Sequence, residues 1–338
     1  MRTSMTWPGR FTLFRLLPVW LAPLLLLASA TVSAQALRIA GNFPANHSSS
    51  LAMAQFKLDV EKASSGEFQI GVFPAMQLGS AQDNVDQVRS GKLFMTWIAT
   101  AYLSRSVPEL SVLSIPFLFP DRQVAFKVVD GKVGLMLKDK LKATGLLPLG
   151  FMELGARQLT SSQRPIRSIT DLKGLKIRLQ PDEIHIATFQ ALGASPVKMD
   201  IKEVYGALQT GALDAQENPF AVIRDRNFDQ VQKHLTNSAH FFDLIVLVAN
   251  RQAFEGLKPE HQKIIQHALS KAVMAQRASA AAEDIGAIVE LGNRGMRFEP
   301  VRPSFRAEMR KATESVTDSV RQKAGAELVQ ATLDAASK

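Results

Sequence analysis

Short runs of apolar residues alternate along the chain with segments whose apolar residues recur every three or four positions. Runs of this kind predict buried strands, and the segments between them predict amphipathic helices. Because strands alternate with helices, we expect an α/β fold whose sheets are largely parallel. Such sheets bind ligands beyond the carboxyl ends of their strands. The predicted strands are Leu37–Ala40, Phe68–Phe73, Leu93–Ile98, Leu147–Leu154, Leu175–Leu179, Leu213–Gln216 and Leu244–Val248.

Two predicted helices end at a glycine that directly precedes a strand. Ser80 followed by Asp83 is the pattern of a capping box at the start of the first helix, and Gly91 ends it. The second helix covers Glu203–Thr210 and ends at Gly211. Both glycines are expected at helix C-termini.

A much longer helical pattern begins at Pro259, extends to Leu291 and ends at Gly292. At about 1.5 Å per residue, this helix would be roughly 50 Å long, which exceeds one small domain. A helix of that length is suited to bracing two lobes. The alternative is a pair of helices broken near Gly286, because an interior glycine costs about 1 kcal/mol relative to alanine.

The N-terminal segment has the three regions of a secretory signal peptide. Three arginines come before an apolar stretch from Leu16 to Ala28, and small residues follow up to Ala34. We expect cleavage after Ala34 and a periplasmic location. The alternative is a membrane anchor, but Pro18 and Pro23 interrupt a stretch that is shorter than the roughly 20 residues needed to span a bilayer.

The composition narrows the class of protein further. The chain contains no cysteine, so its stability must come from a buried core rather than from disulfides. A chain of this length suggests about two domains. Its formal net charge of +9 falls to +6 when the signal peptide is removed, and the remaining charges are spread along the chain. No basic stripe with interleaved aromatic residues is present, so a nucleic-acid partner is not expected.

The sequence contains no pattern of a known catalytic or metal centre. No pair of its six histidines has a zinc-like helical spacing with a nearby carboxylate. The nucleophile elbow, the phosphate-binding loop and the dinucleotide-binding turn are also missing. We therefore expect neither an enzyme nor a cofactor. A secreted α/β enzyme is the alternative that turnover of a bound acid would reveal.

Seven short segments follow one another in a characteristic order. They are Phe73-Pro74 with Gln77–Ser80, Gln87–Gly91, Ile115–Phe119, Asp171–Arg178, Ala191–Ala194, Glu203–Tyr205 and Glu217–Pro219. In this order and spacing the chain resembles the DctP-type solute-binding proteins of TRAP (tripartite ATP-independent periplasmic) transporters. The resemblance implies a type II periplasmic-binding-protein fold, in which two α/β lobes joined by a hinge close on a small organic acid.

The resemblance also implies how the chain is divided and what it binds. Lobe I is expected to contain residues 35–154 and 243–283, and lobe II residues 155–242 and 284–318. Residues 1–34 are the signal peptide, and residues 319–338 form a C-terminal helix or tail. The expected ligand is a carboxylate such as a C4-dicarboxylate, a uronate or a 2-oxo acid, and the expected partners are membrane permease subunits. We expect a monomer. A periplasmic sensor of the same fold is the alternative.

Arg178 is the main candidate for the ligand contact. In Leu175–Leu179 apolar residues alternate with basic ones, and Arg178 lies near the carboxyl end of the predicted strand. A guanidinium can hold a carboxylate through two parallel hydrogen bonds. The resemblance implies the same role for this arginine. The alternative is a solvated arginine at a sheet edge.

Three further polar candidates follow predicted strands. Arg157 lies just past Leu147–Leu154, and the resemblance implies that it also contacts the ligand. Glu217 and Asn218 follow the strand that begins at Leu213, and an amide can both donate to and accept from a carboxylate or a hydroxyl. The alternatives are a surface ion pair for Arg157 and an Asn-Pro turn for Asn218.

The remaining candidates are Trp97, Phe242, Asn42, His47 and Gln82. Each of the two aromatic rings is suited either to packing against the carbon skeleton of the ligand or to the core. The resemblance implies that the loop with Asn42 and His47 contributes to the site, although many relatives have a His-Pro pair where this chain has His47 and serine. Gln82 follows a motif after which relatives often have a glutamate.

Overall fold

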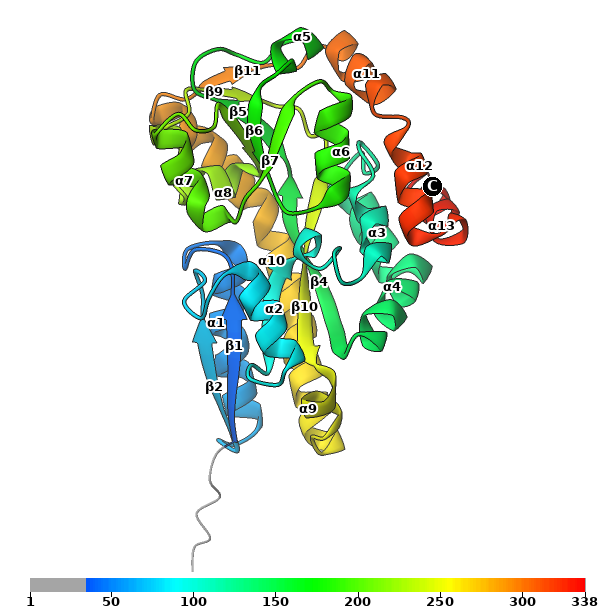
Figure 1. Cartoon of the computed structure of the whole chain (residues 1–338). Coiled ribbons are helices and arrows are strands. Elements are labelled where there is room, and N and C mark those ends of the chain that lie inside the picture. Colours follow the sequence, from blue (N-terminus) through cyan, green and yellow to red (C-terminus); the bar gives the residue numbers. More distant parts are fainter. Residues whose placement is uncertain (1–34, 338) are drawn as a thin grey trace, which may run out of the picture. The chain divides into compact units, whose positions relative to one another are not determined.

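The computed structural model describes residues 35–337 (Figure 1). The predicted signal peptide, residues 1–34, lies outside the described residues. Across the described range, every helix is either too short or too polar to cross a bilayer.

The described chain alternates between strands and helices, as the apolar pattern predicts. The strands are β1 (Gln35–Gly41), β2 (Phe68–Phe73), β3 (Met95–Ala99), β4 (Leu146–Ala156), β5 (Gln158–Ser161), β6 (Lys176–Leu179), β7 (Ser195–Lys198), β8 (Ala215–Asn218), β9 (His234–Thr236), β10 (Phe242–Asn250) and β11 (Arg297–Glu299). The α-helices are α1 (Ser48–Ala63), α2 (Ala81–Arg89), α3 (Arg122–Asp130), α4 (Lys132–Ala143), α5 (Ile169–Leu172), α6 (Glu183–Ala191), α7 (Ile201–Gln209), α8 (Phe220–Asp225), α9 (Arg251–Glu255), α10 (Pro259–Asn293), α11 (Pro303–Ala312), α12 (Val316–Ala324) and α13 (Ala326–Ala336). Short 3-10 helices are η1 (Thr100–Tyr102), η2 (Pro108–Ser114) and η3 (Phe228–Gln230).

The strands form two sheets, which we call the first sheet (order β2-β1-β3-β10-β4) and the second sheet (order β11-β9-β5-β8-β6-β7). In the first sheet β1 is parallel to β2 and β3, whereas β10 is antiparallel to β3 and β4. In the second sheet β6 is parallel to β7 and β8, whereas β5 is antiparallel to β8 and β9. β11 is also parallel to β9, so five strand pairs of the described residues are parallel and four are antiparallel. The sheets are mixed, and the prediction of largely parallel sheets is met only in part. The strands β4, β5 and β10, next to which the chain passes from one sheet to the other, are antiparallel to the strands they pair with.

Four strands were missed by the sequence analysis, namely β5, β7, β9 and β11. Each is three or four residues long, and β7 consists of Ser195, Pro196, Val197 and Lys198 at the edge of the second sheet. Short strands with polar residues have no apolar run to reveal them. Backbone pairing with neighbouring strands of the second sheet makes them strands.

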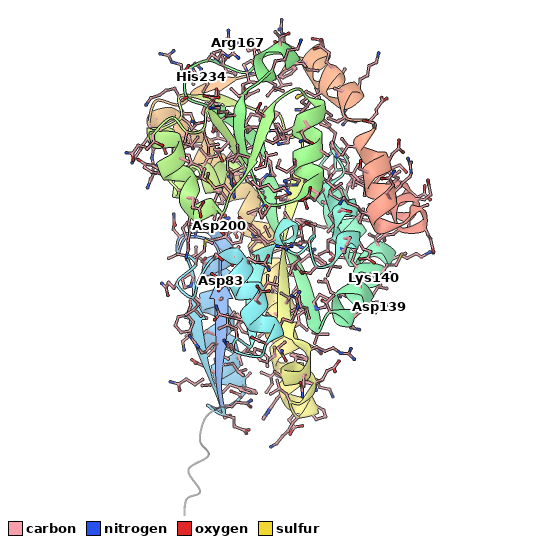
Figure 2. All side chains as sticks on the ribbon, in the orientation of Figure 1. Asp83, Asp139, Lys140, Arg167, Asp200 and His234 are labelled. Carbon is pink, nitrogen blue, oxygen red and sulfur yellow. The ribbon has the colours of Figure 1, made fainter. Side chains whose placement is uncertain are left out.

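The helix signals in the sequence are confirmed. Ser80 Oγ accepts a hydrogen bond from the Asp83 amide at 3.2 Å, and the Asp83 carboxylate accepts from the Ser80 amide at 2.8 Å. Figure 2 labels Asp83 on α2. Helix α10 is continuous from Pro259 to Asn293, so the alternative of a break near Gly286 was wrong. The helix packs against α1 and β4 beside the first sheet and against α8 beside the second (Figure 1). These contacts outweigh the cost of one interior glycine.

The chain passes between the two sheets at residues 156–158 and 236–242, which we call the crossing segments. The hydrophobic core of the first sheet includes Val316 and Val320 of α12 and Leu328 and Val329 of α13. The C-terminal helices therefore pack with the first sheet. The described residues belong to one compact unit, and the division into lobes at residues 154 and 243 stays a prediction.

A buried acid pair lies where α10 packs on β4. Glu153 on β4 is 1% exposed, and Arg122 Nη2 lies 3.5 Å from it and 3.6 Å from Asp284 on α10. Burial raises the pKa of Glu153 to about 7, because the nearby Arg122 offsets the loss of solvent only in part and Asp284 adds repulsion. Burial likewise raises the pKa of Asp284 to about 6. The folded protein therefore retains protons that the unfolded chain releases between about pH 4.5 and about pH 7.

Stability is consequently expected to fall as the pH rises from about 5 to about 8, because proton binding favours the folded state in this window. In the variant Glu153→Gln the new side chain is neutral at every pH, so the variant should lose up to about 3 kcal/mol less unfolding free energy over this pH range than the wild type does. Urea unfolding at a series of pH values measures the free energy of unfolding of both proteins. Glu255→Gln, which removes an exposed carboxylate, is the matched control and should keep the wild-type slope. A Glu153→Gln variant with the same slope as the wild type would show that Glu153 is ionised throughout.

Candidate ligand-binding site

A small cavity of about 30 Å³ lies between residues of the first and second sheets. Asn42 follows β1 and Ala99 ends β3, while Arg178 is the penultimate residue of β6 and Asn218 is the last residue of β8. The carboxyl ends of parallel strands from both sheets therefore meet at one place, as expected for an α/β protein. The complete lining is Asn42, Phe43, Ala99, Tyr102, Leu154, Arg178, Gln180, Ile201, Asn218, Val222 and Arg226.

Arg178 is fully buried in this lining. Its Nε and Nη2 donate to the carbonyl oxygen of Met199 at 3.0 and 2.8 Å, and Nη2 also donates to the hydroxyl oxygen of Tyr102 at 3.3 Å. Among the described residues, Nη1 has no partner. The alternative of a solvated arginine was wrong. The guanidinium is held firmly on one edge and leaves a donor for the cavity.

A second guanidinium in the lining belongs to Arg226, which the sequence analysis missed. Its Nη2 donates to the carbonyl oxygen of Asn42 at 2.9 Å, and burial lowers its pKa. No pattern in the sequence marks Arg226 for this role, because Arg224 stands two residues earlier in the same polar stretch. Arg224 instead forms ion pairs with Asp225 and Glu283. Only the fold distinguishes the two arginines.

Four buried polar atoms of this lining have no hydrogen-bond partner within the described part of the chain. Three are donors, namely Arg178 Nη1, Arg226 Nε and Asn42 Nδ2. The fourth is an acceptor, Gln180 Oε1, which is exposed to the cavity because Gln180 Nε2 donates to Asp243 at 2.9 Å. An unsatisfied buried polar group costs about 1–3 kcal/mol. Their convergence indicates a site for an anion that also carries a hydrogen-bond donor.

Arg157 and Glu217 lie in a buried ion-pair network behind the cavity rather than in its lining. Arg157 Nη1 donates to Asp243 at 2.8 Å, and Nη2 donates to Glu217 Oε1 at 2.8 Å and to its carbonyl oxygen at 2.6 Å. Its Nε also pairs with Glu217. The alternative of a surface ion pair was wrong, because both side chains are fully buried. Arg157 Nη2 also donates to Asn218 Oδ1 at 3.1 Å, so it orients a residue of the lining.

Charge balance in this network depends on Arg157. Burial by itself raises the pKa of Glu217, but Arg157 and a hydrogen bond from His240 outweigh that effect and hold the pKa well below its ordinary range. Burial lowers the pKa of His240. Glu217 is therefore ionised and His240 neutral at pH 7, and the pair of carboxylates on Glu217 and Asp243 needs the guanidinium.

Two of the predicted contact residues, Trp97 and His47, lie outside this cavity and make contacts within the fold. Trp97 is fully buried, donates from Nε1 to Met95 Sδ at 3.0 Å and packs near Phe56, so its ring belongs to the core. His47 is the N-cap of α1, where its Nδ1 accepts from the Ser49 amide at 3.2 Å. Burial lowers the pKa of His47 to about 4, which keeps it neutral. Neither side chain lines the cavity.

Gln82 and Phe242 also lie outside this lining. Gln82 lies on α2, where its Nε2 donates to Asp86 at 3.2 Å. Phe242 begins β10 and packs edge-on against Phe119 and Phe126. Of the nine predicted site residues, the structure therefore brings Arg178, Asn218 and Asn42 together in the cavity.

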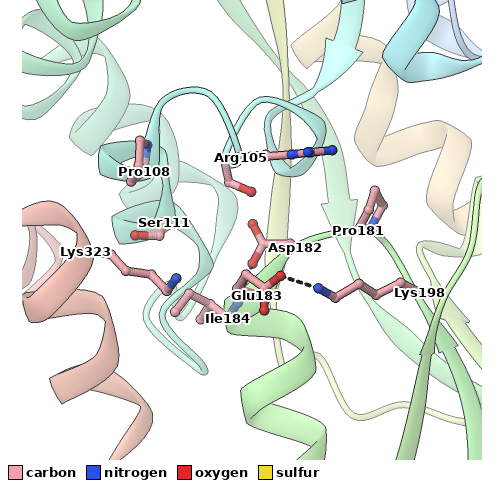
Figure 3. Close-up of a pocket in the computed structure, with 10 residues that line it drawn as sticks. Arg105, Pro108, Ser111, Pro181, Asp182, Glu183, Ile184, Lys198 and Lys323 are labelled. Carbon is pink, nitrogen blue, oxygen red and sulfur yellow. Dashed lines mark hydrogen bonds and ion pairs between the residues drawn. The ribbon is translucent and has the colours of Figure 1, made fainter.

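A wider cavity of about 400 Å³ adjoins the loop that follows β6 (Figure 3). Pro181 and Asp182 line it, and Figure 3 shows the ion pair between Glu183 and Lys198 in its wall. Asp182 adds a buried carboxylate oxygen without a partner among the described residues. Arg105, Lys198 and Lys323 line this space together with the two carboxylates. Its buried unpartnered atom is an acceptor rather than a donor, so it is less suited to an anion than the cavity that holds Arg178 and Arg226.

The comparisons with known proteins agree with this geometry. The model of the bacterial extracellular solute-binding protein family 7, DctP, matches residues 39–323. The 2,3-diketo-L-gulonate-binding periplasmic protein of Escherichia coli is 35% identical over 272 residues, which cover 80% of this chain and 83% of that protein. The galactonate complex of a sugar acid binding protein from Advenella mimigardefordensis matches with a TM-score of 0.88 at 30% identity, covering 90% of this chain and 98% of that one. A D-erythronate complex of a TRAP periplasmic solute binding protein from Polaromonas has a TM-score of 0.84 at 32% identity, covering 88% and 98%.

Proposed function

The chain belongs to family 7 of the bacterial extracellular solute-binding proteins, and on this basis we propose that it is a periplasmic receptor that captures a sugar acid for a TRAP transporter. The observation that carries the ligand class is the set of unpartnered atoms in the cavity, three donors and one acceptor. A carboxylate accepts from donors only, whereas a hydroxyl group both accepts and donates. A hydroxy acid satisfies all four atoms, and a dicarboxylate leaves the Gln180 oxygen unpaired.

In the proposed complex the carboxylate of the ligand lies between Arg178 and Arg226. The free Nη1 of Arg178 and the free Nε of Arg226 are the charged donors of the lining, and charge-assisted hydrogen bonds are about twice as strong as neutral ones. A hydroxyl group of the ligand donates to Gln180 Oε1. The amide of Asn42 supplies a further donor. The sugar acids named for three relatives, 2,3-diketo-L-gulonate, galactonate and D-erythronate, support this class.

Capture requires the two sheets to move apart. The cavity of about 30 Å³ is far smaller than the roughly 300 Å³ at the lower end of ligand pockets. Contacts across it join the two halves, since Arg226 binds the Asn42 carbonyl and Arg178 binds Tyr102. Outside the lining, Lys202 Nζ also donates to the Met76 carbonyl at 3.1 Å. We propose that the crossing segments act as the hinge. A ligand that contacts residues of both sheets then favours closure.

The location and the partners follow from the same proposal. Removal of residues 1–34 as a signal peptide would release the chain into the periplasm, where lobes I and II would close on the ligand and present it to the membrane subunits of the transporter. A receptor of this kind binds its ligand without changing it. Recovery of intact sugar acid after incubation with the purified protein supports the proposal, whereas conversion of the acid argues for an enzyme.

The ligand class is tested by thermal unfolding of residues 35–338 with D-galactonate, D-erythronate, D-glucuronate and succinate. A ligand at about 100 times its dissociation constant stabilises the folded state by about 2.7 kcal/mol. We expect the hydroxy acids to raise the melting temperature and succinate to have a much smaller effect. The reason is that a buried acceptor such as Gln180 Oε1 discriminates strongly against a ligand without a donor.

The variant Gln180→Leu separates the hydroxyl contact from the carboxylate contact. It should weaken hydroxy acids by about 100-fold and leave the weak binding of succinate nearly unchanged, because the hydroxyl is the only ligand group that loses its partner. Asp243 also loses the Gln180 amide but keeps its hydrogen bond from Arg157. Gln163→Leu, at a residue in the loop outside the lining, is the matched control and should bind as the wild type. Preferential binding of succinate by the wild-type protein would overturn the sugar-acid assignment.

A further inference from the structure

A third cavity, of about 350 Å³, adjoins the crossing segments and has no assigned role. Its lining shares no residue with the cavity that holds Arg178. The lining includes the buried aromatic rings of Phe117, Phe119 and Phe242. It also includes two alanines of the crossing segments, Ala156 and Ala239. The volume lies within the range of sites that take small organic molecules.

Three guanidinium groups surround this aromatic floor. Arg306 and Arg310 lie one turn apart on α11, and Arg122 begins α3. Like charges at this helical spacing repel each other and destabilise the helix slightly. The charge is therefore concentrated here at some cost to stability.

The positive charge of α11 is not neutralised by the described part of the chain. Arg306 Nη2 donates only to the Asn237 carbonyl, at 3.4 Å, and burial together with Arg310 lowers the pKa of Arg306. The Arg310 guanidinium lies 5.3 Å from the centre of the Phe117 ring. Within residues 35–337, neither side chain forms an ion pair with a carboxylate.

The other two charged residues of the lining are already engaged in part. Arg122 Nη2 is 3.5 and 3.6 Å from Glu153 and Asp284, while its Nη1 is buried and lacks a partner among the described residues. Asp121 is the acid in the lining, and its Oδ1 caps α3 by accepting from the amides of Gln123 and Val124. The net charge facing the cavity is positive.

We propose that this cavity is a second binding site, which takes an organic anion with a flat apolar body such as an aromatic carboxylate. The carboxylate would bind the guanidinium forks of Arg306 and Arg310, which suit bidentate recognition. The ring would pack against the phenylalanines. The chemistry differs from that of a sugar acid, which is polar over its whole length. The site shares no lining residue with the proposed sugar-acid cavity, although it adjoins the proposed hinge.

The test is calorimetric titration of residues 35–338 with 2-naphthoate, and with 2-naphthamide as the uncharged analogue. We expect 2-naphthoate to bind with a dissociation constant below about 1 mM, which corresponds to about 4 kcal/mol, and the amide not to bind measurably. The double variant Arg306→Gln/Arg310→Gln should weaken 2-naphthoate at least about tenfold, because two charge-assisted contacts are lost. Both changes fall on exposed or half-exposed side chains of α11, so the fold is expected to persist.

Two control variants locate the binding. Arg302→Gln changes an exposed arginine before α11 that does not line the cavity, and it should bind 2-naphthoate as the wild type does. Arg178→Ala should also leave 2-naphthoate binding unchanged, because it alters only the first cavity. The proposal is overturned if 2-naphthoate does not bind, if the double variant binds it equally well, or if Arg178→Ala abolishes the binding.

Discussion

Arg178→Ala is expected to weaken the binding of D-galactonate by between about thirtyfold and several thousandfold. Removing one partner of a buried hydrogen-bonded charge pair costs about 2–5 kcal/mol, mostly because the other charge is left buried and unpaired. Arg178 is fully buried, and one of its donors faces the cavity without a protein partner. The carboxylate of a bound acid would lose this donor. Calorimetric titration of residues 35–338 measures the change.

Arg178→Lys distinguishes charge from geometry. Lysine keeps the positive charge but cannot hold the Met199 carbonyl and a carboxylate with one planar fork, so an intermediate affinity is expected. Arg251→Ala removes an exposed arginine of α9 and should bind as the wild type does. If the wild-type protein binds a sugar acid and Arg178→Ala binds it within about threefold, less than 1 kcal/mol, the anchor has been assigned to the wrong residue. If no sugar acid binds the wild type, the ligand class is wrong.

Arg157→Met is expected to destabilise the folded protein by about 3–5 kcal/mol, because it leaves two buried carboxylates without their cation. The side chains of Glu217 and Asp243 are 0% and 4% exposed, and both bind Arg157 directly. A loss of this size lowers the melting temperature by roughly 5–10 °C. Urea and thermal unfolding of the wild type and the variant measure it.

The loss should depend on pH with a definite sign. In the wild type, Arg157 helps to hold the pKa of Glu217 below its unfolded value, so this pair stabilises the fold above about pH 4.5 and loses its effect as the pH falls further. In the variant the Glu217 carboxylate, without Arg157, becomes protonated more readily as the pH falls. The difference between the two proteins should therefore be largest near pH 7 and shrink towards pH 4.

A second substitution separates charge from packing. Glu217→Gln in the Arg157→Met background removes one of the two unpaired charges and should recover part of the stability at pH 7, since an unpaired buried charge costs more than a neutral amide. Equal stability of Arg157→Met and the wild type at pH 7 would contradict the structural role of the network. A loss of stability that does not change with pH would assign the effect to packing alone.

The candidate site was predicted only in part from the sequence. Arg178 was found because its position near the end of an apolar strand, the chemistry of its side chain and the family resemblance agreed. Arg226 and Gln180 were missed, since they lie in polar loops where no periodicity distinguishes a buried side chain from an exposed one. Trp97 was expected at the end of its strand but is the middle residue of β3, and strand position alone leaves open which face the ring occupies. In the folded chain it lies on the core face.

By itself, the sequence determined the local elements and the class of the protein. The spacing of apolar residues predicted the main strands and the length of α10, and the capping residues and glycines predicted the helix ends, including the capping box at Ser80. These features depend on residues within a few positions of one another. The tertiary structure decided which polar side chains meet. Arg157 lies behind the cavity and Arg226 lines it, because Glu217 and Asp243 surround the first, whereas the Asn42 carbonyl fixes the second and leaves one of its donors free. The partners of Arg157 and Arg226 are distant along the chain, so their meeting depends on how the sheets pack.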